Sequence, residues 1–237
     1  MTQVTLPEAS NDVTRAARLY SELRGTPPGT RRDLRNYVKV FLGMDVPDKR
    51  ICPGHHSPMD YLWDRFTVDI RRAPGVEGVP PSNRGQDARD TTTSDIIVWA
   101  NRAGGKTELA AVATLLDCIF KSNCQVRILG GSGDQAGRMY EYLTGFLRHG
   151  FEPYMAGPAL KAKCHFRNGS GVEVLTQSAT SVRGQHVQRL RCDELELFDE
   201  NVFAAAKFTT QSTADINAAM ELISTMHRPY GLMHKAV

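Results

Sequence analysis

The sequence predicts an α/β fold in which a mainly parallel central sheet is flanked by helices, with a helical appendage at the N-terminus. Two observations lead to this prediction. A β-favouring run, a glycine-bearing loop and a helix-like run follow one another at residues 96–120, and the same order returns at residues 125–147. Because each helix must cross back over the sheet before the next strand begins, successive strands in such units lie parallel.

Size and composition fit a globular protein. The 237 residues suffice for one α/β domain with a sizeable core, or for a core with a small appendage. No run approaches eighteen apolar residues, and the first residues lack the basic and apolar regions of a secretory signal, so we expect no membrane segment and no export. Five scattered cysteines fit reduced thiols in a cytoplasm. The net charge of +3 permits contact with nucleic acid without arguing for it.

The N-terminal region, residues 1–72, is predicted to be helical. One helix is expected from Asn11 or Asp12 to Leu23, and a second from Arg31 to Leu42 with a stop at Gly43. Ser57 can cap a third helix that begins with Pro58. The aromatic residues near this helix, His56, Tyr61 and Trp63, could stack on an adenine base, or the helix could simply cover an edge of the sheet.

Residues 73–94 are polar and rich in proline and glycine, which predicts a linker or loop before a core at residues 95–237. The core elements follow in order: a strand at 96–99, a helix from Lys106 to Phe120, a strand at 125–129, a helix containing Met139 to Leu147, a hairpin at 164–175 with an Asn168-Gly169 turn, a segment at 190–194 and a strand at 220–223. Lys163 and Arg167 on the hairpin could face a neighbouring subunit or DNA.

The loop between residues 99 and 106 has the composition of a phosphate-binding loop. Its pattern matches G-x-x-x-x-G-K-[ST] with one departure, since Ala100 stands where the first glycine is expected. In such a loop the backbone N–H groups and the helix N-terminus attract phosphate, Lys106 reaches the β- and γ-phosphates of ATP, and the Thr107 hydroxyl ligates Mg²⁺. The predicted nucleotide-binding residues are Ala100, Asn101, Arg102, Ala103, Gly104, Gly105, Lys106, Thr107 and Glu108.

Hydrolysis needs a carboxylate near Mg²⁺ and a second group that orients the attacking water. Asp193 is the predicted Mg²⁺ partner and Glu194 the predicted catalytic base. Arg189 and Arg191 interrupt this segment, although a central parallel strand is normally apolar, so an ordinary acidic turn is the alternative. Ser224 and Thr225 follow the last predicted strand, at the sheet edge where ligands bind in α/β folds, and a hydroxyl pair there can sense the γ-phosphate.

Together these motifs resemble the N-terminal ATPase domain of the large terminase subunit of tailed bacteriophages, over about residues 95–235. The resemblance rests on the order of Arg102 within the phosphate loop, Gly133-Asp134-Gln135-Ala136, Asn168-Gly169-Ser170, Val182-Arg183-Gly184, Cys192-Asp193-Glu194, and Ile223-Ser224-Thr225 followed by Pro229-Tyr230-Gly231-Leu232. It implies a P-loop NTPase fold of the RecA-like class with a catalytic glutamate. It also implies that Arg102 is the arginine of the Walker A loop and that Ser224 and Thr225 form the coupling motif.

The resemblance further implies an ATP- and Mg²⁺-dependent motor in the host cytoplasm. Its expected partners are double-stranded DNA, the portal protein, the small terminase subunit and further copies of itself in a ring, expected to be a pentamer. A second arginine would come from a neighbouring subunit, with Arg138, Arg167 and Arg183 as unranked candidates. Large terminases also carry a nuclease domain, which we expect to be absent from this chain.

Two other functions stay open from the sequence. One is a different P-loop ATPase, such as a helicase, although a two-core helicase needs a second RecA-like domain that 237 residues do not hold. The other is a nucleotide-binding assembly module without catalysis, in which the N-terminal helices dock a partner. The arginine-interrupted segment before Asp193 is what keeps this second alternative open.

Overall fold

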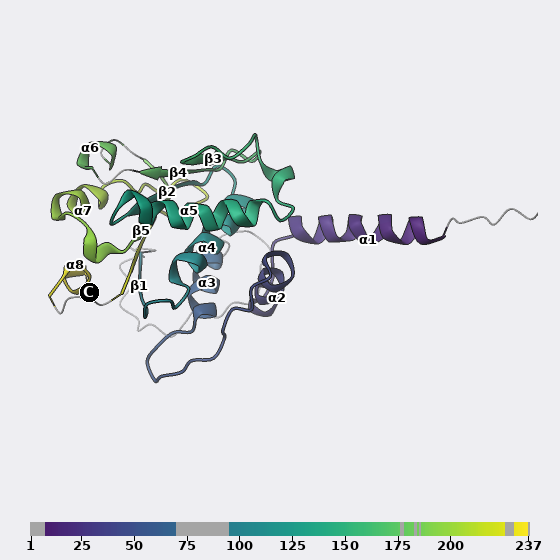
Figure 1. Ribbon diagram of the computed structural model, residues 1–237, viewed down its shortest axis with the longest axis horizontal. Helices are drawn as coiled ribbons and strands as arrows, with labels where there is room; N and C mark the ends of the chain where they lie inside the picture. The colour runs from purple at the N-terminus through teal and green to yellow at the C-terminus, as the bar shows by residue number, and fades with distance from the viewer. Residues whose placement is uncertain are drawn as a thin grey trace, which may run out of the picture. The chain divides into compact units, whose positions relative to one another are not determined.

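The computed structural model describes residues 8–69, 95–175, 178–182, 184, 186–225 and 230–236. The chain divides into two compact units, Met1–Val46 and Pro47–Val237 (Figure 1). The first contains α1 (Glu8–Gly25) and α2 (Arg31–Leu42). The predicted bounds of α2 are confirmed, with Gly43 in the left-handed conformation that ends a helix, whereas α1 begins earlier than predicted.

The second unit holds the sheet and the remaining helices. Its elements are α3 (Pro58–Thr67), β1 (Ile96–Trp99), α4 (Lys106–Phe120), β2 (Gln125–Gly130), α5 (Gly133–Leu147), η2 (Glu152–Tyr154), β3 (Lys163–His165), β4 (Gly171–Leu175), α6 (Ala179–Val182), β5 (Arg189–Asp193), η3 (Leu195–Leu197), α7 (Glu200–Ala206), β6 (Ala219–Ser224) and α8 (Leu232–Ala236).

The six strands in the described part of the chain lie in the order β1-β6-β5-β2-β4-β3. Every neighbouring pair is parallel except β3 and β4, which form the predicted hairpin. The last strand of the chain, β6, lies between β1 and β5. This arrangement, with the glycine-rich loop between β1 and α4, is the fold of a P-loop NTPase and confirms the predicted fold class.

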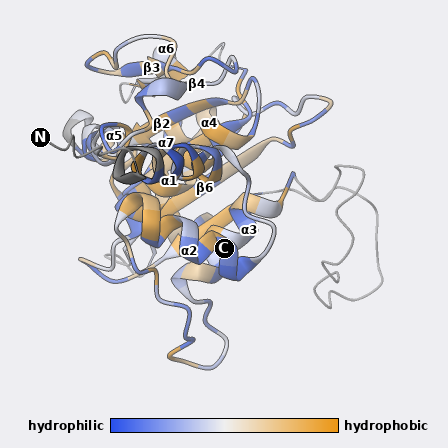
Figure 2. Cartoon of the chain, turned by 90° about the vertical axis from the view of Figure 1, so that its right-hand side faces the viewer, coloured by the Kyte–Doolittle hydropathy of each residue, from blue (hydrophilic) through white to orange (hydrophobic). Residues whose placement is uncertain are grey.

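Helix α4 is deeply buried next to the sheet, and both α3 and α5 contact it. Helix α4 and strand β6 are mainly hydrophobic (Figure 2). Ser57 and Asp60 cap α3 reciprocally, and Pro58 is its first residue, as predicted. The chain divides after Val46, so α3 falls in the same unit as the core rather than with α1 and α2. The predicted linker at residues 73–94 lies outside the described residues.

Parallel packing brings the carboxyl ends of β1, β5 and β6 to one edge of the sheet. Trp99 is aligned with Ser224, and Asp193 with Ile223. The phosphate loop, the acidic pair and the hydroxyl pair therefore follow three adjacent strands at this edge. Separately, no helix within the described ranges is both long and apolar enough to cross a membrane.

Candidate nucleotide-binding site

The phosphate loop makes a tight turn between β1 and α4. Gly104 donates its N–H to the Asn101 carbonyl at 3.2 Å, and Gly105 adopts a φ of 71° immediately before the helix. Ala103 also has a positive φ, of 56°, whereas Ala100 does not. Because only a left-handed backbone specifically favours glycine, alanine can occupy position 100 without strain. The N–H of Ala100 donates to the Ser224 carbonyl at 3.3 Å, which ties the loop to the end of β6.

Two side-chain contacts join the loop to the acidic pair. The Thr107 hydroxyl donates to Asp193 Oδ2 at 2.9 Å. Lys106 Nζ lies 3.1 Å from Glu194 Oε1 in an ion pair that is largely buried. The first contact links residues that are 86 positions apart in the sequence, because α4 begins beside the end of β5. The structure therefore brings together the four residues that the sequence assigns to phosphate, Mg²⁺ and water.

Asp193 is buried, and this changes its acidity. Burial raises the pKa of Asp193 to about 6, against the hydrogen bond from Thr107, which lowers it; the charge of Glu194 raises it further. A buried carboxyl group that is difficult to ionise is stabilised most strongly in its charged form when a cation lies beside it. A cation bound beside Asp193 would stabilise its charged form.

Glu194 has a left-handed backbone, with φ 54° and ψ 52°. This conformation costs a non-glycine residue about 1 kcal/mol or more, and such residues concentrate at functional sites. The turn at Glu194 lies between β5 and the short helix η3. It directs the side chain to Lys106 rather than along the sheet.

Ser224 and Thr225 are buried at the end of β6. The Ser224 hydroxyl donates to the Thr225 carbonyl at 3.2 Å, and the N–H of Glu196 reaches Ser224 Oγ at 3.5 Å. Ser224 therefore contacts both the phosphate loop, through Ala100, and the segment that follows Glu194. Ser224 thus lies between the two halves of the candidate site.

The other predicted residues are less constrained. Arg102 is exposed on the loop and forms no ion pair with any described residue, while Glu108 is half-buried in the first turn of α4. Arg138 on α5 and Arg167 on the hairpin are both exposed. Arg183 lies outside the described residues. Within the described part of one chain, the structure thus places none of these candidate arginines against the acidic pair.

The two arginines that interrupt β5 are buried and paired. Arg191 Nη2 contacts Asp117 Oδ2 at 2.6 Å and Glu221 Oε1 at 3.1 Å. Arg189 pairs with Asp69, and Lys121 Nζ lies 2.8 Å from Asp69 and 2.6 Å from Asp117. Three cations thus meet three carboxylates, so the polar segment is a true central strand. We call Asp69, Asp117, Lys121, Arg189, Arg191 and Glu221 the buried charge network.

Tyr61 belongs beside this network and not at an adenine site. Its hydroxyl donates to Glu221 Oε2 at 2.7 Å in the protein interior. The hypothesis that Tyr61 stacks on adenine is therefore wrong, because its ring is buried in the core. The sequence did contain signals for this network. Asp117 and Lys121 are charged residues within and directly after the mainly apolar second half of α4, and Glu221 is a carboxylate within a mainly apolar strand.

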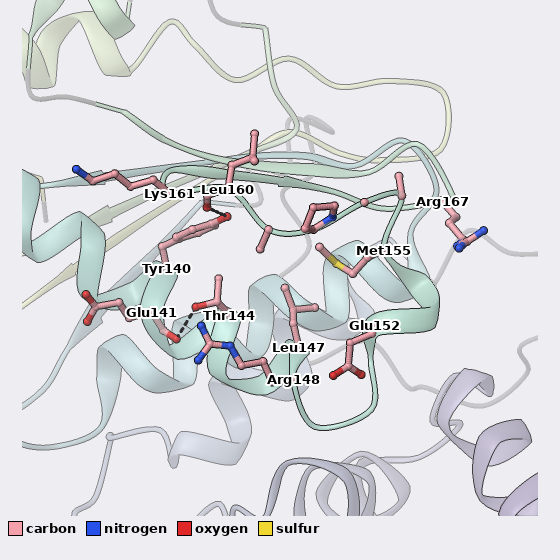
Figure 3. A pocket seen from close by; sticks show the side chains of 14 residues that line it. Tyr140, Glu141, Thr144, Leu147, Arg148, Glu152, Met155, Leu160, Lys161 and Arg167 are labelled. Carbon is pink, nitrogen blue, oxygen red and sulfur yellow. Dashed lines mark hydrogen bonds between the residues drawn. The ribbon is translucent and has the colours of Figure 1, made fainter.

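A cavity of about 660 Å³ lies away from the phosphate loop, between α5 and the loop that precedes β3 (Figure 3). Some of its polar groups are already satisfied: the Tyr140 hydroxyl donates to the Leu160 carbonyl and the Thr144 hydroxyl to the Glu141 carbonyl. None of the predicted nucleotide-binding residues lines it. We therefore place the candidate site at the phosphate loop.

The residues at the loop fit Mg²⁺. Thr107 and Asp193 offer a hydroxyl and a carboxylate oxygen within 2.9 Å of each other, and hard oxygen donors of this kind suit Mg²⁺. Two protein ligands are usual where nucleotide phosphates supply others. Among the described residues, no group of three or more His, Cys, Asp or Glu is placed to hold a metal ion by itself.

Comparison with known proteins gives likeness at the level of structure alone. No family model matches the sequence, and no curated protein matches it. The ATPase domain of the large terminase of Thermus phage P74-26 aligns with 60% of this chain and 62% of its own, at 19% identity and a TM-score of 0.45. The large terminase of a second, thermophilic bacteriophage aligns with 68% of this chain and 38% of its own, at 11% identity and a TM-score of 0.45.

A structure of this second terminase in complex with ADP aligns with 55% of this chain and 33% of its own, at 14% identity and a TM-score of 0.42. This chain thus spans less than two thirds of each of these solved chains. Likeness at these identities and scores does not transfer an activity, so the chemistry of the site rests on its own residues. All three of these solved structures are large terminases of thermophilic phages.

Proposed function

We propose that this chain is the ATPase motor domain of a viral large terminase, which hydrolyses ATP to drive double-stranded DNA into a procapsid. The hydrolytic part of the proposal is carried by one observation. Thr107 and Lys106, at the start of α4, contact Asp193 and Glu194, at the end of β5, at 2.9 and 3.1 Å. A phosphate cradle facing a carboxylate pair in this way has the parts that phosphoryl transfer to water requires.

Each residue has a role in this proposal. Lys106 and the amides of residues 103–107 hold the β- and γ-phosphates. Thr107 and Asp193 hold Mg²⁺, which when bound neutralises charge on the phosphate oxygens. Glu194 accepts a hydrogen bond from the attacking water and orients it toward the γ-phosphate.

Lys106 and Glu194 form an ion pair at the site. A γ-phosphate competes with Glu194 for Lys106, because both are anions within reach of the same ammonium group. Binding of ATP therefore frees the Glu194 carboxylate to contact water. In this way the base becomes available only when a substrate is in place.

The motor part of the proposal rests on Arg102, Ser224 and Thr225. Arg102 is on the exposed face of the loop, where it can approach the γ-phosphate and stabilise charge in the transition state. Ser224 contacts both halves of the site, so it can couple the release of phosphate to movement of the domain. A second arginine, Arg138, Arg167 or Arg183, would enter from a neighbouring subunit, so we expect weak turnover by the monomer.

A phosphate-release assay tests the hydrolytic role. Wild-type protein is compared with Glu194→Gln, with and without double-stranded DNA and portal protein. We expect slow ATP-dependent release by wild type, stimulated by DNA and portal, and none above background by Glu194→Gln, which should still bind Mg-ATP.

Three outcomes would count against the proposal. Normal hydrolysis by Glu194→Gln would remove Glu194 from its role as base. Binding of ATP by the wild type with no release under any condition would favour the assembly module without catalysis. Stimulation by single-stranded rather than double-stranded DNA would favour a helicase-like enzyme.

A further inference from the structure

The buried charge network lies beside the candidate site and touches three of the elements that form it. Helix α4 holds Lys106 and Thr107 at one end and Asp117 about 16 Å further along. Strand β5 contains Arg189 and Arg191 and ends at Asp193. Because alternate residues of a strand share a face, Arg191 points to the same side of the sheet as Asp193.

Arg191 contacts both neighbours of β5. Its guanidinium reaches Asp117 on α4 at 2.6 Å, and Nε donates to Glu221 Oε2 on β6 at 3.1 Å. Arg191 and Glu221 are also directly opposite each other in the sheet. Two contacts thus join helix α4 to β5, namely Thr107–Asp193 and Asp117–Arg191. A third, Arg191–Glu221, joins β5 to β6, the strand that ends in Ser224.

Filling the core with these charged side chains costs free energy of desolvation. Removing charges from water costs several kcal/mol per ion, and apolar residues of similar volume are often as stable or more so. The network is also incompletely satisfied, since Arg191 Nη1 has no hydrogen-bond partner among the residues that the structure describes. Stability alone is therefore a poor reason for placing Arg191 in the centre of the sheet.

We propose that Arg191 is a positioning residue: it fixes the register of α4, β5 and β6 so that Lys106 and Thr107, Asp193 and Glu194, and Ser224 meet at the sheet edge. Directional guanidinium–carboxylate contacts suit this role, because they hold one relative placement of the three elements where apolar packing tolerates several. The proposal rests on the hydrolytic function assigned to the site, and its test is chosen to be read without hydrolysis as well.

The test compares Arg191→Lys with a matched control, Arg127→Met. Lysine keeps the charge but cannot contact Asp117 and Glu221 through a planar fork. Arg127 lies on the adjacent strand β2, where it pairs with Glu173 at 3.3 Å. It is aligned with Leu190 and therefore faces the opposite side of the sheet from Arg191.

A second variant covers the case in which Arg191→Lys does not fold. Glu221→Gln then replaces it, because an amide keeps the shape of the carboxylate and a carbonyl oxygen for Tyr61 while it removes the charge that faces Arg191. The same two readouts apply to this variant, with the same expected direction.

The first readout is steady-state phosphate release at a temperature where both variants are folded. We expect Arg191→Lys to lower kcat by about tenfold to a hundredfold, the size of effect that a displacement of about 1 Å at reacting groups produces, with KM for ATP changed less than about twofold. The control should match wild type in both constants.

The second readout is hydrogen exchange at two backbone amides. The Ala100 N–H bonds the Ser224 carbonyl, and the Gly131 N–H bonds the Asp193 carbonyl at 3.0 Å, so both report on the aligned strand ends. We expect faster exchange at both amides in Arg191→Lys, with the β2–β4 ladder unchanged. Unchanged exchange at both amides, or an unchanged kcat in active protein, would overturn the positioning role.

The two proposals fail in different ways. If wild-type protein releases no phosphate, the hydrolytic function fails, and exchange at Ala100 and Gly131 alone decides whether Arg191 holds the strand ends. If wild type is active and Arg191→Lys equals it in kcat and in exchange, the positioning role fails while the hydrolytic function stands.

Discussion

Burial of Asp193 makes its ionised form energetically costly. Its carboxyl is nearly fully buried, and burial together with the neighbouring Glu194 raises its pKa to about 6, while Thr107 and Lys106 act in the opposite direction. Ionisation of Asp193 therefore opposes folding. A neighbouring divalent cation favours the ionised form of such a group.

This cost predicts a specific pH dependence of stability. The pKa of Asp193 is higher in the folded chain than the value of about 3.9 in an unfolded one, so between these values the folded state binds the proton and the unfolded state does not. Stability from this group therefore rises as the pH falls through 6. Relative to Asp193→Asn, we expect the free energy of unfolding of wild type to increase by about 1 kcal/mol from pH 7 to pH 5.

Urea unfolding of both proteins at the two pH values, without Mg²⁺ or nucleotide, measures this difference. Because every other titratable group is the same in the two proteins, the comparison with Asp193→Asn isolates the contribution of Asp193. A difference between the two proteins that does not vary with pH would show that Asp193 is solvated like an ordinary surface carboxylate.

Single residues of the site could be predicted from the sequence because each has a local signal. Lys106 and Thr107 follow the glycines at the start of a helix, and Asp193 and Glu194 end a strand. The partners of Arg189 and Arg191 could not be predicted, since Asp69, Asp117 and Glu221 come from three separate segments and meet only through the topology of the sheet.

Among the elements, the turn after β2 and the short helix η3 pack against each other closely. A Cβ atom added at Gly131 would lie 2.6 Å from Leu197 Cβ and 2.7 Å from Gln135 Oε1. Real Cβ atoms do not approach this closely, so η3 must move if residue 131 has a side chain. Because η3 begins directly after Glu194, the lack of a side chain at Gly131 allows the segment that contains Glu194 to occupy its position.

We therefore expect Gly131→Ala to destabilise the protein by about 1–3 kcal/mol, the usual cost of overpacking, and to reduce phosphate release. Gly145→Ala is the control, because an added Cβ there meets nothing within 4 Å and lies inside helix α5. That variant should be neutral or more stable by up to about 1 kcal/mol. Thermal unfolding of both variants checks this, and a Gly131→Ala protein as stable as wild type would refute the close packing of η3.

The elements themselves were largely predictable. Helix α2 has the predicted bounds, α3 begins at the predicted cap, and the hairpin of β3 and β4 turns at Gly169, whose φ is 84°. Helix α1 was predicted too short because its start lacks a single dominant cap. The polar residues of β5 made that strand the most doubtful element, since charges inside a central strand can be interpreted only when their partners are known.

For the whole molecule, the strand order determines the site. Two consecutive strand–helix units predict a parallel sheet, but they do not specify that β6 lies between β1 and β5. Only this order places Ser224 between the phosphate loop and the acidic pair. Hydrophobic periodicity does not specify this order, because it indicates which residues form strands but not which strands are neighbours.

The central claim is that the loop from residue 100 to residue 107 binds the phosphates of ATP through Lys106. Calorimetric titration of Mg-ATP into wild type, Lys106→Ala and Lys163→Ala tests it, with Lys163 serving as an exposed lysine on β3, outside the loop. We predict binding by wild type and by Lys163→Ala, and an affinity at least about tenfold to a hundredfold lower for Lys106→Ala, as expected for loss of a charge-assisted contact. Undiminished affinity in Lys106→Ala, or no binding by wild type, would contradict it.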